Sequence, residues 1–288
     1  MKERTEDLIC ANYVVGFVDI LGQRAEYEGQ GLLPHMPDGK MPEAFAEKLK
    51  NTIGVIRDIH KTSEKFLSGF KTPSTMRDTL PPELKAEFDR LRVCSTKHQR
   101  WSDGIVYFQS LSESHDPVPM NGVFGLTAAL AHLCFLGLAK KAPIRGGIEI
   151  AWAVELEPGE IYGAAVARAY EIESIKAQWP RIVVGSEMLK YLERAAGATP
   201  IDMASGSNRA LAEVVRSWIV PDVDGEPIID YLGTSFKTHF ANPVFGEVYK
   251  RACAFIEEQC VQWESKGDIK LAKRYRSLEK YFMSRKPA

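Results

Sequence analysis

Two aspartates in this sequence stand where strands are expected to end, and their type and spacing suit metal chemistry. Asp19 closes the apolar run 13–20 (YVVGFVDI), and Asp103 lies at the apex of a turn between two strand-like segments. Carboxylates at adjacent strand ends, with the backbone carbonyl of Ile20 as a further ligand, suit magnesium or manganese. Two such ions about 3.5–4 Å apart can activate an attacking oxygen and stabilise a departing pyrophosphate. The alternative is that both aspartates only cap turns.

The segments around these aspartates predict an α+β fold with a ferredoxin-like βαββαβ core. Strands are expected at 13–20, 91–98, 104–111, 144–154 and 182–184, and helices at 42–66, 118–140 and 164–176. This order forms an antiparallel sheet with helices on one face, in which Asp19 and Asp103 are neighbours. The turn at 99–103 is also expected to bring Arg100 close to Asp103.

The remaining segments predict additions to this core. Residues 67–91 are polar and read as an insert with a short helix. A strand-turn-strand pattern is expected at 211–232, around Asp224-Gly225, and two amphipathic helices at 245–266 and 269–283. The paired glycines Gly146 and Gly147 inside a strand indicate close approach of another backbone or a bulge. We place a catalytic domain at 8–235 and a helical C-terminal extension at 236–288.

Composition excludes several classes of partner. The chain of 288 residues has 45% hydrophobic and 26% charged residues, which is typical of globular proteins. Its 37 basic and 38 acidic side chains give a net charge of -1, so charge does not favour nucleic acid or an anionic membrane as a partner. The apolar stretch 123–138 is short and mixed, and the charged N-terminus does not have the pattern of a secretory signal. A cytoplasmic protein is expected.

Several segments together resemble one enzyme family. They are FVDILG (17–22), WSDGIVYF (101–108), IRGGIEIAWA (144–153), EIYGAAVARAYEIES (160–174) and WPRIVVG (179–185). In this order they resemble the class III nucleotidyl cyclases, and among these the bacterial pyrimidine cyclases of cyclic-nucleotide (Pycsar) anti-phage defence. The resemblance covers about residues 12–190. It does not cover the insert or the C-terminal helices.

The resemblance implies roles for the two aspartates and for positions 99 and 100. The two metal-binding aspartates of the family fall on Asp19 and Asp103, and the backbone metal contact falls on Ile20. The base-reading lysine of purine cyclases is replaced by Gln99, with Arg100 beside it. This departure speaks against a purine base.

A second stretch departs from the family at two positions. The asparagine and arginine that contact ribose and phosphate in adenylate and guanylate cyclases are replaced by Ala167 and Glu171. Arg168 could supply positive charge from another angle, or could be solvated. Glu160 aligns near a second base-reading position and could accept a hydrogen bond from a base. Family members are homodimers with sites between subunits, so a monomer is expected to be inactive.

The resemblance implies conversion of UTP to 3′,5′-cyclic UMP and pyrophosphate, a second messenger that a downstream effector reads. Two divalent ions, manganese or magnesium, are the implied cofactors. Bulky groups such as Arg100 or Trp101 could narrow the base pocket to fit a pyrimidine. CTP remains an alternative substrate. A catalytically silent, nucleotide-binding dimer is another alternative, motivated by positions 167 and 171, and Gln99 disfavours an adenylate cyclase.

Overall fold

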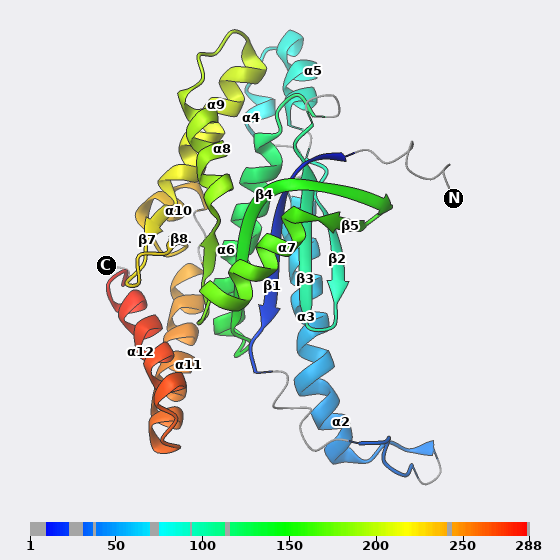
Figure 1. Ribbon diagram of the computed structural model, residues 1–288, viewed down its shortest axis with the longest axis vertical. Helices are drawn as coiled ribbons and strands as arrows, with labels where there is room; N and C mark the ends of the chain where they lie inside the picture. Colours follow the sequence, from blue (N-terminus) through cyan, green and yellow to red (C-terminus); the bar gives the residue numbers. More distant parts are fainter. Residues whose placement is uncertain are drawn as a thin grey trace.

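A computed structural model describes residues 10–22, 31–36, 39–69, 75–92, 94–112, 116–240 and 244–286. Residues 8 and 9 of the predicted catalytic domain and residues 70–74 of the predicted insert therefore lie outside the described residues. In the described part of the chain, helices surround one mostly antiparallel eight-stranded sheet (Figure 1). The α+β class predicted from the sequence is confirmed.

The sheet has the order β2-β3-β1-β4-β6-β8-β7, and β5 pairs with β4 off this path. Its strands are β1 Cys10–Ile20, β2 Lys97–Trp101, β3 Gly104–Ser110, β4 Ile144–Glu157, β5 Glu160–Gly163, β6 Ile182–Val184, β7 Ile219–Pro221 and β8 Pro227–Ile229. β1 lies between β3 and β4 and is antiparallel to both. Because a strand flanks it on each side and helices cover both faces, the run from Tyr13 to Val18 is fully buried.

The helices fill the connections between these strands. They are α2 Glu43–Leu49, α3 Val55–Gly69, α4 Thr75–Asp78, α5 Pro82–Leu91, α6 Met120–Ala139, α7 Ala164–Glu171, α8 Ser186–Gly197, α9 Met203–Ser217, α10 Thr234–His239, α11 Phe245–Ser265 and α12 Ile269–Met283. Two π-helical turns continue neighbouring helices, η2 at Lys50–Gly54 and η3 at Ile172–Lys176. The turn η3 extends α7 toward β6 and, as shown below, carries a residue of the candidate site.

Hydrophobic clusters lie on both faces of the sheet, so the expectation of helices on one face only is wrong. Val14 and Val18 of β1 belong to the large core that contains α6, whereas Val15 and Phe17 belong to a smaller core under α7. Figure 1 shows α7 crossing the sheet near β1 and β4. The chain reaches this second face because β5 folds back on β4 immediately before α7 begins.

Helix α6 is apolar around its whole circumference because it lies inside the large core. It is long and apolar enough to cross a membrane by length and composition alone, but most of its residues are buried within the protein. That burial is typical of a core helix.

Three predicted elements have different boundaries in the structure. The strand expected at 91–98 is wrong, because Leu91 ends α5 and β2 begins only at Lys97. The turn expected at 99–103 is tighter, and residues 99–101 belong to β2. The predicted hairpin around Asp224-Gly225 is confirmed as β7 and β8, but residues 211–217 are the end of α9.

The C-terminal helices pack on the large core. Figure 1 shows α11 and α12 side by side, next to α6. Tyr249 of α11 donates a hydrogen bond to the carbonyl of Phe282 in α12 at 2.7 Å. Lys141, in the turn before β4, forms an ion pair with Glu258 of α11 at 2.6 Å. The C-terminal helices are therefore also linked to the turn just before the first residue of β4.

Candidate metal and nucleotide site

Asp19 and Asp103 are neighbours at one end of the sheet, as the sequence predicts. In the pairing of β1 with β3, Asp19 lies opposite Gly104, the residue that follows Asp103. Ser102 and Asp103 form the two-residue turn between β2 and β3, and Ser102 has a φ of 55°. The tight turn holds Asp103 next to the end of β1, which brings the two carboxylates together.

The electrostatic environment of Asp19 reflects this crowding. Burial, and then the charge of Asp103, raise the pKa of Asp19 to about 6, although Arg145 acts in the opposite direction. The negative charges of Asp19 and Asp103 repel each other, and Arg145 only partly offsets this repulsion. A bound cation would stabilise such a pair of carboxylates.

This coupling gives a direct test of the geometry. In metal-free protein, Asp103→Asn is expected to lower the pKa of Asp19 below about 6, because the variant removes a neighbouring negative charge. The pKa should stay above its ordinary value, because burial is the larger cause. Carboxyl ¹³C chemical shifts followed through a pH titration measure this change. An unchanged Asp19 titration would contradict the proximity of the two carboxylates.

Arg145 and Glu173 complete the charged cluster, and the sequence analysis assigned a role to neither. Arg145 lies opposite Asp19 in the pairing of β1 with β4, and its Nη2 is 3.7 Å from Oδ2 of Asp19. Its Nε is 2.5 Å from Oε1 of Glu173 in η3. The Glu173 side chain is 2% exposed, and burial raises its pKa to about 7 while Arg145 lowers it. Arg145 could have been identified from the register between β1 and β4, which places it beside Asp19.

A further arginine reaches this cluster from the C-terminal extension. Burial, and then the positive charge of Arg145, lower the pKa of Arg274 in α12, while Asp268 acts in the opposite direction. Arg145 therefore adds positive charge beside Asp19, and Arg274 lies near Arg145.

The donor set suits a magnesium or manganese ion that is also held by substrate phosphates and water. No group of three or more histidine, cysteine, aspartate or glutamate side chains is placed to bind a metal in the described ranges. Asp19 and Asp103 supply two carboxylates, and Ile20, the last residue of β1, supplies a nearby backbone carbonyl. Magnesium is commonly held by one or two carboxylates together with substrate phosphates and water. The residues present fit that mode of binding.

The two predicted base contacts from β2 point to opposite faces of the sheet. The Gln99 side-chain oxygen accepts a hydrogen bond from the backbone N–H of Ile161 in β5 at 3.1 Å. Arg100 instead pairs with Glu64 of α3 at 2.5 Å, so the expected approach of Arg100 to Asp103 is wrong. The physical reason is that successive side chains of a strand alternate between faces. Gln99 shares the face of Asp19, and Arg100 does not.

Glu160 and Arg168 also lie apart from the aspartates of their own chain. Glu160 begins β5 and pairs in register with Glu157, at the far end of β4 from Arg145. Arg168 is exposed on α7, and its charge acts on Glu187 of α8. Neither residue is brought to Asp19 within one chain.

Aromatic side chains lie beside the aspartates on the α7 face. The ring of Phe17 contacts Trp101 with centroids 6.2 Å apart and Tyr170 with centroids 5.2 Å apart. Trp101 is 45% exposed and Tyr170 is 51% exposed. Exposed aromatic rings next to a charged cluster can stack on a nucleobase.

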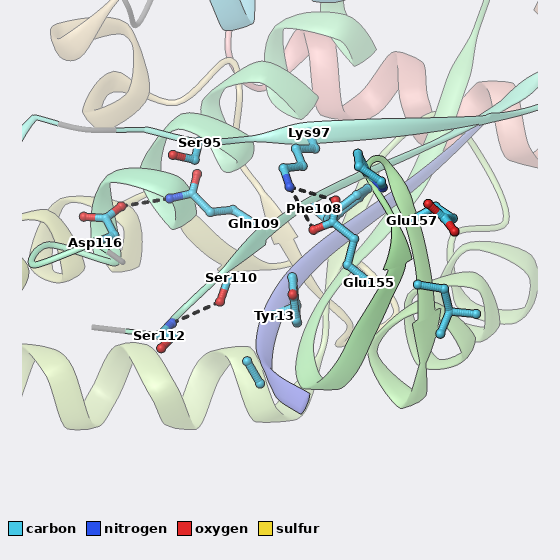
Figure 2. Close-up of a pocket in the computed structure, with 13 residues that line it drawn as sticks. Tyr13, Ser95, Lys97, Phe108, Gln109, Ser110, Ser112, Asp116, Glu155 and Glu157 are labelled. Atoms are coloured by element: carbon cyan, nitrogen blue, oxygen red, sulfur yellow. Dashed lines mark hydrogen bonds and ion pairs between the residues drawn. The ribbon is translucent and has the colours of Figure 1, made fainter. Parts of the chain in front are cut away.

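A separate cavity of about 530 Å³ lies at the other end of the same strands. Tyr13 and Ser110, which pair across β1 and β3, line it, six positions along β1 from Asp19. Figure 2 shows Lys97 directed at Glu155, with which it forms an ion pair at 2.7 Å. The cavity is therefore distinct from the aspartate site.

Comparisons with known proteins add no family assignment. No protein-family model matches the chain, and no curated protein matches its sequence.

Proposed function

We propose that this chain is a class III nucleotidyl cyclase that converts UTP to 3′,5′-cyclic UMP and pyrophosphate. In this proposal the strands β2-β3-β1-β4 are the ferredoxin-like core of the cyclase catalytic domain. The observation that carries the proposal is the pair Asp19 and Asp103 at adjacent strand ends, with Arg145 beside them. The order of the motifs along the chain and the replacement of a purine-reading lysine by Gln99 give further support.

The proposed reaction requires mainly positioning and electrostatic stabilisation. The ribose 3′-oxygen attacks the α-phosphorus in line, and pyrophosphate leaves with the negative charge that develops on its oxygens. Metal ions bound at this site would acidify the 3′-hydroxyl and neutralise phosphate charge. Asp19 and Asp103 would hold these ions, and the backbone carbonyl of Ile20 would assist. Arg145 would attract the triphosphate and stabilise the departing pyrophosphate.

A homodimer would complete the site. Glu160 and Arg168 lie away from the aspartates of their own chain, and the side chain of Gln99 is bonded to β5, so we assign these residues to base, ribose or phosphate contacts across a subunit interface. Trp101 and Tyr170 are large exposed aromatics on the same face as Asp19 and are available for such contacts. The product would be a second messenger in anti-phage defence, read by a separate effector.

One observation keeps a catalytically silent, nucleotide-binding dimer as a second candidate. Gln99 already uses its side-chain oxygen on the backbone of β5, and Ala167 and Glu171 replace the usual polar contacts of purine cyclases. Such a protein would bind nucleotide without turnover. CTP is the alternative substrate if the enzyme is active. Uracil and cytosine have similar shapes and differ by one reversal of hydrogen-bond donor and acceptor on the base edge.

The test is product analysis with the four nucleoside triphosphates supplied separately with manganese. Chromatography and mass spectrometry should detect cyclic UMP and pyrophosphate from UTP and no cyclic purine nucleotide. Cyclic CMP alone would correct the base assignment. Nucleotide binding by a confirmed dimer without any product would favour the silent module, and a cyclic purine would contradict the interpretation of Gln99.

A further inference from the structure

We propose that Glu173 is a positioning residue that holds Arg145 away from Asp19, so that Asp19 stays available to a divalent cation. The inference rests on the metal site of the proposed function and assigns a role to two side chains that are not metal ligands. Glu173 would not bind the metal. It would determine whether Arg145 or the metal neutralises Asp19.

The distances show an unequal competition for Arg145. Its Nε lies 2.5 Å from Oε1 of Glu173, whereas its Nη2 lies 3.7 Å from Oδ2 of Asp19. Glu173 is 2% exposed and Asp19 is 26% exposed, so water screens the contact with Glu173 less. The guanidinium therefore pairs mainly with Glu173, through charge and not through an aligned hydrogen bond.

The backbone of η3, which carries Glu173, is held close to β4. An added Cβ at Gly147 of β4 would lie 2.5 Å from the carbonyl oxygen of Ala169 and 2.8 Å from the backbone nitrogen of Glu173. Only glycine lets the end of α7 and the turn η3 approach β4 this closely. At the far end of η3, Arg181 donates a 2.8 Å hydrogen bond to the carbonyl of Lys176. The backbone that carries Glu173 is thus packed against β4 at one end of η3 and bonded to Arg181 at the other.

Loss of the Glu173 charge would release Arg145 toward the carboxylates. Asp19 would then be the nearest remaining acidic partner, and the guanidinium would compete with a divalent cation for it. Residues that orient metal ligands from outside the ligand set typically alter metal affinity by about 10- to 100-fold. The expected consequence is weaker metal binding without any change to the ligands themselves.

The experiment measures manganese binding to the full chain without nucleotide, by electron paramagnetic resonance of free Mn²⁺ at pH 8, because Glu173, whose pKa is raised to about 7, is ionised there. Glu173→Gln is expected to weaken Mn²⁺ binding about tenfold. The double variant Arg145→Met with Glu173→Gln removes the competing cation and should bind Mn²⁺ at least as tightly as the unaltered protein. This recovery separates positioning from packing damage, because a packing defect would persist or worsen in the double variant.

Glu149→Gln is the matched control. Glu149 is a buried acid of β4. Its side chain accepts hydrogen bonds from the backbone N–H of Ile150 in β4 and from that of Met188 at the start of α8. This variant should lower the melting temperature and leave Mn²⁺ affinity within about twofold, because it lies away from the aspartates.

Three results would overturn the inference. They are unaltered Mn²⁺ affinity in folded Glu173→Gln, no recovery in the double variant, and no Mn²⁺ binding by the unaltered protein. Failure of the proposed function is a separate result. If no nucleotide is cyclised but the weakening and the recovery are both observed, the positioning role of Glu173 stands without the cyclase.

Discussion

The proposed cyclase function predicts that Asp19→Asn reduces cyclic nucleotide formation by at least about 10³-fold. The amide keeps the shape of the carboxylate but removes the negative charge that would bind a divalent ion beside Asp103. Without bound metal, neither the 3′-hydroxyl nor the phosphate charge would be stabilised for attack. Initial rates with UTP and manganese, measured on purified protein, check this result.

The same substitution should not weaken the fold. The pKa of Asp19 is raised to about 6, so the folded protein binds this proton more tightly than the unfolded chain does. The corresponding stabilisation is complete below the ordinary aspartate pKa and is lost as the pH rises through about 6. At pH 7.5, Asp19→Asn is therefore expected to melt at the same temperature as the unaltered protein or higher.

Asp58→Asn is the control for this pair of measurements. Asp58 is an exposed residue of α3 that pairs with Lys140 at 3.7 Å. Exposed pairs contribute little, so activity and melting temperature should both stay close to those of the unaltered protein. Full turnover in Asp19→Asn would contradict the metal-site assignment, whereas a large loss in Asp58→Asn would show that the assay reports general damage.

Elements with strong local patterns could be predicted from the sequence. The apolar run of β1, the uniformly apolar α6 and the Asp224-Gly225 hairpin are all confirmed, because hydrophobic periodicity and turn residues act over a few neighbours. The position of Asp19 relative to Asp103 also followed, because the order of the elements predicts which strand ends meet.

The helix α9 shows where local interpretation failed. Its C-terminal half is rich in valine and was assigned to a strand, although Leu211, Val214 and Val215 have helical spacing. The sequence also contained a start signal, since Asp202 and Ser205 form a reciprocal capping box. β-branched residues favour strands only weakly, and packing against α6 and α8 decides the outcome here.

The cluster around Asp19 required long-range information. Arg145 lies 126 positions along the chain from Asp19. The two residues are adjacent only because of the register between β1 and β4. Glu173 arrives through a π-helical turn that local periodicity does not predict. The glycine pair was the one local signal, because the predicted close approach of another backbone is confirmed at Gly147.

Gly147→Ala is accordingly expected to damage stability and metal binding together. The added methyl group would lie within 2.5–2.8 Å of atoms of Ala169, Ile172 and Glu173, two of them backbone atoms that cannot rotate away. Relief requires the end of α7 and η3 to move off β4, at a cost of about 2–3 kcal/mol. Calorimetry should show a melting temperature lower by about 5–10 °C.

Gly206→Ala provides the opposite expectation in the same protein. Gly206 lies within α9, where an added Cβ would meet only Pro200 at an ordinary 3.9 Å. This helix position should gain about 0.5–1 kcal/mol from the substitution. Because Gly147 acts through the position of Glu173, Gly147→Ala should also weaken Mn²⁺ binding, and Gly206→Ala should not. Equal stability of the two variants would contradict the tight contact between β4 and η3 on which the position of Glu173 depends.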